Sequence, residues 1–214
     1  DGVGLVRTEN LLDKIENIFD EELQYILYNK IAESLYPKPV TFRLFDFGYD
    51  KLNLNNETES NPALGLRGIR YLLRNNNILQ LQLNALIRAS VNGNLRILIP
   101  MVTNISEIES IFNIAKKISK ELGIYCPKIG TMIETPSAAY NSKDICKISD
   151  FVSIGTNDLL QYFYAADRNN TQVQEYLNYS DKSFITLLTS ILKNCNTSNK
   201  ELTICGQMAS EEDS

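Results

Sequence analysis

Short apolar runs alternate with longer segments of helical period along the whole chain, and this alternation constrains the fold more than any other feature. The six apolar runs are residues 3–6, 40–42, 95–99, 128–133, 151–154 and 202–204. Runs of this length are typical of strands that are buried on both faces. Because they lie too far apart for hairpins, helices must connect them, and the pattern predicts a parallel sheet with right-handed crossovers.

Three connecting segments have a clear period of about 3.6 residues, which predicts helices over residues 78–91, 106–122 and 181–194. Within 106–122, Ser106 and Glu109 form a candidate capping box, and Gly123 is a candidate C-terminal stop. Two sets of apolar residues are expected on the buried faces of the second and third helices: Ile108, Ile111, Phe112, Ala115, Ile118 and Leu122, and Phe184, Leu187, Leu188, Ile191 and Leu192.

No change in composition marks a domain boundary, so residues 1–214 are interpreted as a single α/β domain. Residues 53–61 are polar and rich in turn-forming side chains, which predicts an exposed loop.

The positions of the chemically capable residues favour a closed barrel over an open sheet. At or near the carboxyl ends of five separate strands lie Arg7, Arg43, Glu134, Asn157, Asp158 and Cys205. The active sites of (β/α) barrels are at that end, whereas an open sheet gathers its ligands at one switch point. The pattern fits both architectures, and these positions favour a (β/α) barrel.

Composition excludes several classes of chemistry. The chain has no histidine, which removes the usual zinc and haem ligand, the Ser-His and Cys-His nucleophile pairs, and any phosphohistidine on these 214 residues. The net charge is −5 and the Lys and Arg residues are scattered, so the sequence shows no basic cluster that would bind nucleic acid. No apolar run approaches the roughly 20 residues that a membrane helix needs. Four cysteines without a CxxC pair are typical of reduced thiols in a cytosolic protein.

Two carboxylates, Glu134 and Asp158, follow two different strands. Together with substrate oxygens and water they would suit Mg²⁺, which seldom uses a cage made only of protein ligands. The alternative is that each carboxylate caps the helix after its strand.

Arginine, cysteine and asparagine side chains complete the candidate site. Arg7, Arg43, Arg67 and Arg168 could grip a carboxylate or a phosphate with two hydrogen bonds each, or could be ordinary surface residues. Arg43 interrupts an apolar run, and a charge that points inward needs a partner. Cys205 could donate or accept a proton, or could simply pack in the apolar core. The amide of Asn157 could bind an anion or form a turn.

Five motifs now show a resemblance to a known family. They are residues 4–9 (GLVRTE), 61–70 (NPALGLRGIR), 130–136 (GTMIETP), 153–159 (SIGTNDL) and 205–209 (CGQMA). In this order they resemble the C-terminal barrel of phosphoenolpyruvate-utilising enzymes, and among these most resemble enzyme I of the bacterial sugar phosphotransferase system. Residues 166–170 (ADRNN) and Met208 favour enzyme I over its relative, pyruvate phosphate dikinase.

The resemblance implies a role for each candidate residue. Arg7, Arg43 and Arg168 would bind the phosphate and carboxylate of phosphoenolpyruvate, with Arg67 nearby. Asn157 would help to orient this substrate. Glu134 and Asp158 would hold Mg²⁺, and Cys205 would protonate the enolate to give pyruvate.

The resemblance also implies partners. The phosphoryl acceptor would be a histidine on a separate N-terminal domain, which passes the group to a small phosphocarrier protein, and the barrel would form a homodimer in the cytoplasm. The family barrel is a (β/α)8 TIM-type barrel with one strand before the motif at residues 4–9 and another after the motif at residues 205–209. The resemblance therefore implies that the chain is an incomplete segment of about six strands and part of a longer polypeptide.

The sequence departs from the family pattern at a few positions. Leu44 and Tyr49 stand where the family usually has Thr and Gly, Gln207 stands where it has an acid, and Ser210 where it has Gly. Two alternatives therefore stay open: the barrel of pyruvate phosphate dikinase or phosphoenolpyruvate synthase, and a degenerate barrel that binds phosphoenolpyruvate or a partner chain without turnover.

Overall fold

The computed structural model describes residues 2–12, 14–47 and 59–210, which form two compact units. The first unit comprises Asp1–Met101 and Glu109–Ile129, and the second comprises Val102–Ile108 and Gly130–Ser214. Tyr49 and most of the predicted loop at 53–61 lie outside the described residues.

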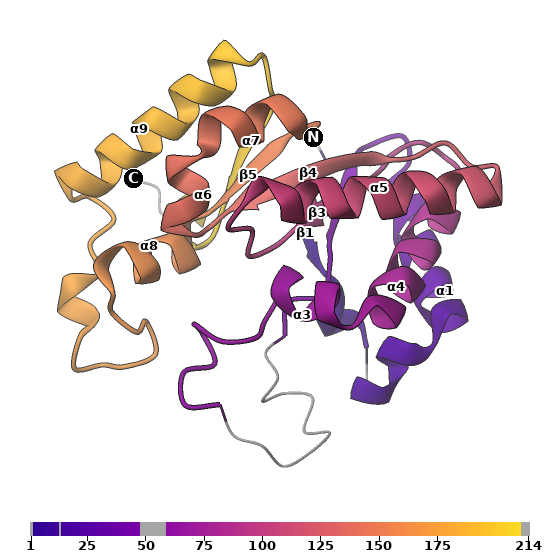
Figure 1. The fold of residues 1–214 in the computed structure, drawn as a ribbon, viewed down its shortest axis with the longest axis horizontal. Helices are drawn as coiled ribbons and strands as arrows, with labels where there is room; N and C mark the ends of the chain where they lie inside the picture. The colour runs from indigo at the N-terminus through magenta and orange to yellow at the C-terminus, as the bar shows by residue number, and fades with distance from the viewer. Residues whose placement is uncertain (1, 13, 48–58, 211–214) are drawn as a thin grey trace. The chain divides into compact units, whose positions relative to one another are not determined.

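In the first unit, strands β1 (Val3–Arg7), β2 (Val40–Arg43) and β3 (Leu95–Ile99) run parallel in sequence order. Helix α1 (Glu21–Leu35) connects the first pair, and α3 (Ile69–Arg74) and α4 (Asn76–Ala89) connect the second. Helices α1 and α4 lie side by side (Figure 1). The short 3-10 helices η1 (Thr8–Leu11) and η2 (Ile15–Phe19) lead from β1 to α1.

In the second unit, strands β4 (Lys128–Ile133), β5 (Val152–Gly155) and β6 (Leu202–Cys205) are again parallel and in sequence order. The helices between them are α6 (Pro136–Tyr140), α7 (Ser142–Ile148), α8 (Thr156–Tyr164) and α9 (Lys182–Thr197). Helix α5 (Ile105–Leu122) lies between β3 and β4 in the chain. Two further 3-10 helices are η3 (Gln174–Tyr176) and η4 (Gln207–Ser210).

The predicted strands are confirmed. Each of the six matches its apolar run to within one residue at either end, and the strands within each unit pair in parallel. Six parallel strands with intervening helices are an incomplete α/β barrel, so the predicted fold class is confirmed as well. The three predicted helices are present as α4, α5 and α9.

The predicted capping box at the start of α5 is wrong. The helix begins at Ile105, one residue before Ser106, and Glu107 rather than Glu109 reaches back to the free backbone amides. Its Oε2 accepts hydrogen bonds from the backbone nitrogens of Thr103 (2.7 Å) and Asn104 (3.0 Å). Asn104 and Glu107 thus have the same three-residue spacing as the predicted pair, two positions earlier.

The predicted stop of α5 at Gly123 is confirmed. Gly123 adopts a φ of +66°, and the backbone nitrogen of Ile124 donates back to the carbonyl oxygen of Ser119 at 3.0 Å, which closes the helix end. Two expected buried positions are wrong, because Leu122 in the last turn of α5 is 39% exposed and Leu192 on α9 is 46% exposed.

The core of each unit is mainly apolar. In the first unit the ring of Tyr28 on α1 packs against Phe42 on β2, with centroids 5.3 Å apart. In the second, Phe184, Ile191 and Cys195 of α9 are fully buried. All four cysteines are free thiols. Within the part of the chain that the structure describes, no helix is both long and apolar enough to cross a membrane.

Candidate functional site

Arg43 lies in a cluster of opposite charges where β2 ends. The residue is only 7% exposed, and its guanidinium forms ion pairs with Glu9 and with Asp46, the latter at 2.9 Å between Nη1 and Oδ2. Arg67 binds the same Asp46 through Nε (3.1 Å) and Nη2 (2.8 Å). The structure thus supplies the partners that an inward arginine requires, and it holds two guanidinium groups in fixed positions. Glu9 and Asp46 were not among the predicted site residues.

Arg7 is the last residue of β1 and is paired in register with Arg43, the last residue of β2. Its side chain is exposed. Two arginines therefore lie at the carboxyl ends of neighbouring strands, as the sequence predicts, although they differ in burial.

A buried polar network beneath these arginines connects the ends of β1 and β2. The side-chain oxygen of Gln82 on α4 accepts from the backbone nitrogen of Phe45 (3.0 Å), and its nitrogen donates to Thr8 Oγ1 (3.0 Å). Thr8 Oγ1 in turn donates to the carbonyl oxygen of Arg43 (2.7 Å). Gln82 and Thr8 are fully buried. Because each group has a partner of the right kind, the network fixes the backbone that carries Arg43.

The two carboxylates lie at adjacent strand ends in the second unit. Glu134 is 1% exposed and directly follows Ile133, which pairs in register with Ile154. Asp158 is 6% exposed and lies in the first turn of α8, where the positive end of the helix dipole favours a negative charge. Gly155, at the end of β5, lies against the Glu134 side chain, because a Cβ placed at Gly155 would be 2.6 Å from Glu134 Oε2.

Neither carboxylate is the N-cap of the helix that follows its strand. Thr135, not Glu134, caps α6, because its Oγ1 accepts from the backbone nitrogen of Ala138 at 3.1 Å. The N-cap of α8 is Gly155, three residues before Asp158. Arg168 lies beside this pair, with its Nη2 3.6 Å from Asp158 Oδ1.

The donor set fits a hard divalent cation. Two buried carboxylates would supply oxygen ligands, which Mg²⁺ prefers, and would leave its other positions to oxygen ligands from elsewhere. Within residues 2–12, 14–47 and 59–210, no cluster of three or more Asp, Glu, His or Cys forms a complete protein cage.

Cys205 is half-buried at the end of β6, between a donor and an acceptor. Its Sγ donates to the carbonyl oxygen of Ile154 (3.3 Å), and the hydroxyl of Ser153 donates to the sulfur (3.7 Å). A thiol with both kinds of partner has a hydrogen bond whether it holds or has released its proton. The following Gly206 has a φ of +115°, a conformation that favours glycine.

Asn157 is the second residue of α8, and its side-chain oxygen is held by two donors. They are the hydroxyl of Tyr179 and the backbone nitrogen of Gln207, each at 3.0 Å. The sequence analysis missed Tyr179, because no motif connects it to Asn157, 22 residues earlier.

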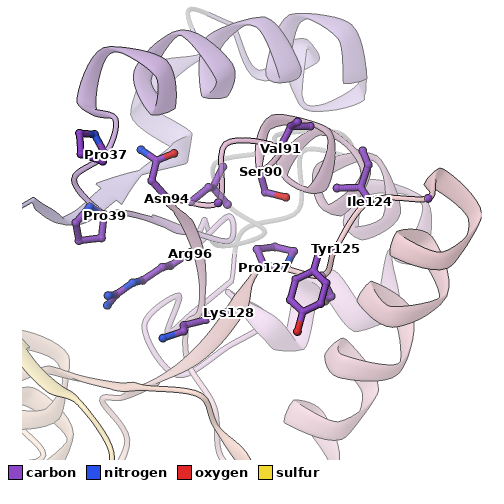
Figure 2. A pocket seen from close by; sticks show the side chains of 14 residues that line it. Pro37, Pro39, Ser90, Val91, Asn94, Arg96, Ile124, Tyr125, Pro127 and Lys128 are labelled. Carbon is purple, nitrogen blue, oxygen red and sulfur yellow. The ribbon is translucent and has the colours of Figure 1, made fainter.

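A hollow of about 610 Å³ lies at the opposite, amino ends of β2, β3 and β4 (Figure 2). The residues that line it include Pro37, Asn94, Arg96, Tyr125 and Lys128. None of the predicted site residues belongs to this lining, so the hollow is separate from the clusters described above.

The fold and these clusters define an incomplete α/β barrel with cationic and carboxylate groups at the carboxyl ends of its strands. A family model described as "PEP-utilising enzyme, PEP-binding domain" matches residues 1–214. The chain therefore belongs to the family of phosphoenolpyruvate-utilising enzymes, as the motifs predict.

Curated relatives agree with this assignment. The chain is 38% identical over 220 residues to the phosphoenolpyruvate-protein phosphotransferase of Priestia megaterium, which covers 99% of this chain and 38% of the relative. It is 36% identical over 219 residues to an Escherichia coli (strain K12) protein named for the phosphoenolpyruvate-dependent phosphotransferase system, which covers 99% of this chain and 29% of the relative. The chain thus spans between a quarter and two fifths of the length of these relatives.

Solved structures share the fold alone. A citrate lyase from Burkholderia xenovorans superposes with a TM-score of 0.53 at 15% identity, covering 84% of this chain and 50% of the other. A malate synthase from Haloferax volcanii gives 0.50 at 11% identity, covering 94% and 59%.

Proposed function

We propose that residues 1–214 form the phosphoenolpyruvate-binding domain of an enzyme that transfers the phosphoryl group of this substrate to a protein histidine. The family match over the whole chain carries the proposal. The most similar relatives named above are phosphotransferases of this kind, which favours this reaction over those of the dikinase and the synthase.

The arginines are assigned to the anionic groups of the substrate. Arg7, Arg43 and Arg168 bind its phosphate and carboxylate, and Arg67 supports Arg43 through their shared partner Asp46. Guanidinium groups that are already held in place lose little freedom on binding, and they offset the charge of the phosphoryl group during transfer.

The carboxylates are assigned to the metal ion. Glu134 and Asp158 would hold Mg²⁺, and a divalent ion bound there would neutralise negative charge on the substrate during transfer. The amide of Asn157 donates to the substrate anion and orients it.

Cys205 is assigned to the protonation step. The bond between phosphorus and the enol oxygen breaks, and a new bond forms between phosphorus and a nitrogen of the acceptor histidine. The Sγ proton of Cys205 moves to the methylene carbon of the enolate to give pyruvate, and the thiolate recovers a proton from water. The hydroxyl of Ser153, which donates to the sulfur, stabilises the thiolate between these steps.

The acceptor histidine is placed on a separate N-terminal domain, because these 214 residues contain none. From there the phosphoryl group passes to a small phosphocarrier protein as the first step of sugar uptake in the cytoplasm. The barrel pairs with a second copy to form a homodimer.

A pyruvate-release assay on the full-length protein tests this assignment through Cys205→Ala. We expect phosphoenolpyruvate to bind as in wild type, and pyruvate formation to fall by about 100-fold, the usual size of a general-acid contribution. Cys126→Ala is the matched control, because that thiol is also half-buried and has no assigned role. Tight binding without any pyruvate from the wild-type protein would instead favour a barrel that binds without turnover.

A further inference from the structure

The orientation of the Asn157 side chain is fixed by its neighbours. The backbone nitrogen of Gln207 lies 3.0 Å from the terminal atom assigned as Oδ1. A backbone N–H can only donate, so the atom facing it must be the amide oxygen and not the nitrogen. The hydroxyl of Tyr179 donates to the same oxygen at 3.0 Å. Two donors thus hold one end of the amide.

The other end of the amide is a donor. With Oδ1 turned towards Gln207 and Tyr179, Nδ2 carries two N–H groups on the opposite side. Among the residues that the structure describes, none accepts a hydrogen bond from Nδ2, whereas Oδ1 has two partners. Such a group is suited to donate to an anion beside Asp158 and the first turn of α8.

Tyr179 is itself held in place. Its ring packs edge-on against Phe184, with centroids 6.4 Å apart and an interplanar angle of 70°. Phe184 is fully buried on α9. The close approach of the chain after β6 depends on Gly206, because a Cβ at this position would lie 2.8 Å from Asn157 Oδ1. The two donors on Oδ1 therefore come from two different segments of the second unit, one before α9 and one after β6.

We propose that Tyr179 is a positioning residue of the phosphoenolpyruvate site, whose hydroxyl turns the N–H groups of Asn157 towards the substrate anion. The inference rests on the proposed function. It adds a residue that none of the motifs contains, and it assigns to Gln207 a contribution through its backbone, which any side chain at that position would keep.

The test compares Tyr179→Phe with Tyr164→Phe in the full-length protein. The control is closely matched, because the ring of Tyr164 also packs against Phe184, with centroids 6.4 Å apart, while its hydroxyl is hydrogen-bonded to Ser183 (3.3 Å) and not to Asn157 Oδ1. Tyr179→Phe removes one hydrogen bond of ordinary strength. We therefore expect it to weaken phosphoenolpyruvate binding and to raise KM by about 5- to 10-fold. The value of kcat should change less than about twofold, and Tyr164→Phe should match wild type.

An Asn157→Ala background separates positioning from a general structural role. There Tyr179→Phe should cause no further loss of phosphoenolpyruvate affinity, since the amide that it positions is gone. An unchanged KM in the single variant, or an equal loss in both backgrounds, would overturn the inference while leaving the proposed function intact. Failure of the wild-type protein to bind phosphoenolpyruvate would overturn both.

Discussion

At the scale of single residues, sequence position identifies the charged groups better than it identifies their partners. Arg43 could be singled out because it interrupts an apolar run, and Glu134 because it directly follows one. Gln82 could not, because its hydrogen bonds reach Phe45, Thr8 and Tyr28, which are 37, 74 and 54 residues away. Contacts of this kind depend on how helices pack against strand ends, which no local pattern records.

Gly155 gives a test of the carboxylate pair. Its φ of −88° is accessible to alanine, so the cost of Gly155→Ala comes from the new Cβ, 2.6 Å from Glu134 Oε2 and 2.8 Å from Glu134 Cβ. We expect the displaced carboxylate to raise the magnesium concentration for half-maximal activity by about tenfold, which corresponds to about 1.4 kcal/mol.

The matched control is Gly4→Ala, because a Cβ at Gly4 meets no atom within 4 Å. Titration of magnesium against pyruvate release compares the two variants. An unchanged magnesium requirement in Gly155→Ala would contradict the role assigned to Glu134.

At the scale of elements, the strands could be predicted because buried parallel strands leave continuous apolar runs. The sequence of helix α1 shows no comparable apolar pattern. Its buried face includes Gln24 and Tyr28, whose polar atoms are satisfied inside the first unit, so its apolar period is weak. The capping box at α5 was misplaced because two overlapping pairs have the same spacing, and only the observed contacts of Glu107 distinguish them.

The stability of the first turn of α9 should depend on pH, because an ionisable residue, Asp181, caps this helix. Asp181 Oδ1 accepts from the backbone nitrogen of Ser183 at 2.8 Å, and the Ser183 hydroxyl and backbone lower the pKa of Asp181. A lowered folded-state pKa means that the carboxylate stabilises the folded state above its unfolded pKa of about 3.9. This stabilisation is lost as the pH falls through the lowered value.

Thermal unfolding followed by circular dichroism checks this dependence. Asp181→Ala should lower Tm at pH 7, and the difference from wild type should shrink as the pH falls below about 3.9. Asp181→Asn keeps an oxygen acceptor without the charge, so its Tm at pH 7 should lie closer to wild type than that of Asp181→Ala, and its difference from wild type should change over the same pH range. If the difference in Tm between Asp181→Ala and wild type stayed constant down to pH 2, the predicted contribution of the Asp181 carboxylate would be contradicted.

At the scale of the whole molecule, the proposed roles are divided between the two units. Arg7, Arg43 and Arg67 belong to the first, and the carboxylates, Asn157, Arg168 and Cys205 belong to the second. The family model matches residues of both units. The absence of histidine, which excludes many mechanisms when considered alone, agrees with a domain that binds the phosphoryl donor and acts on an acceptor elsewhere.

Calorimetric titration of phosphoenolpyruvate into the full-length protein, with magnesium and with a chelator, tests the central claim most directly. The account predicts saturable binding in magnesium, and binding at least about tenfold weaker in the chelator, because Glu134 and Asp158 would then repel the substrate anion instead of neutralising it through the metal. Binding of equal strength under both conditions would contradict the metal site, and no binding under either would contradict the assignment of phosphoenolpyruvate itself.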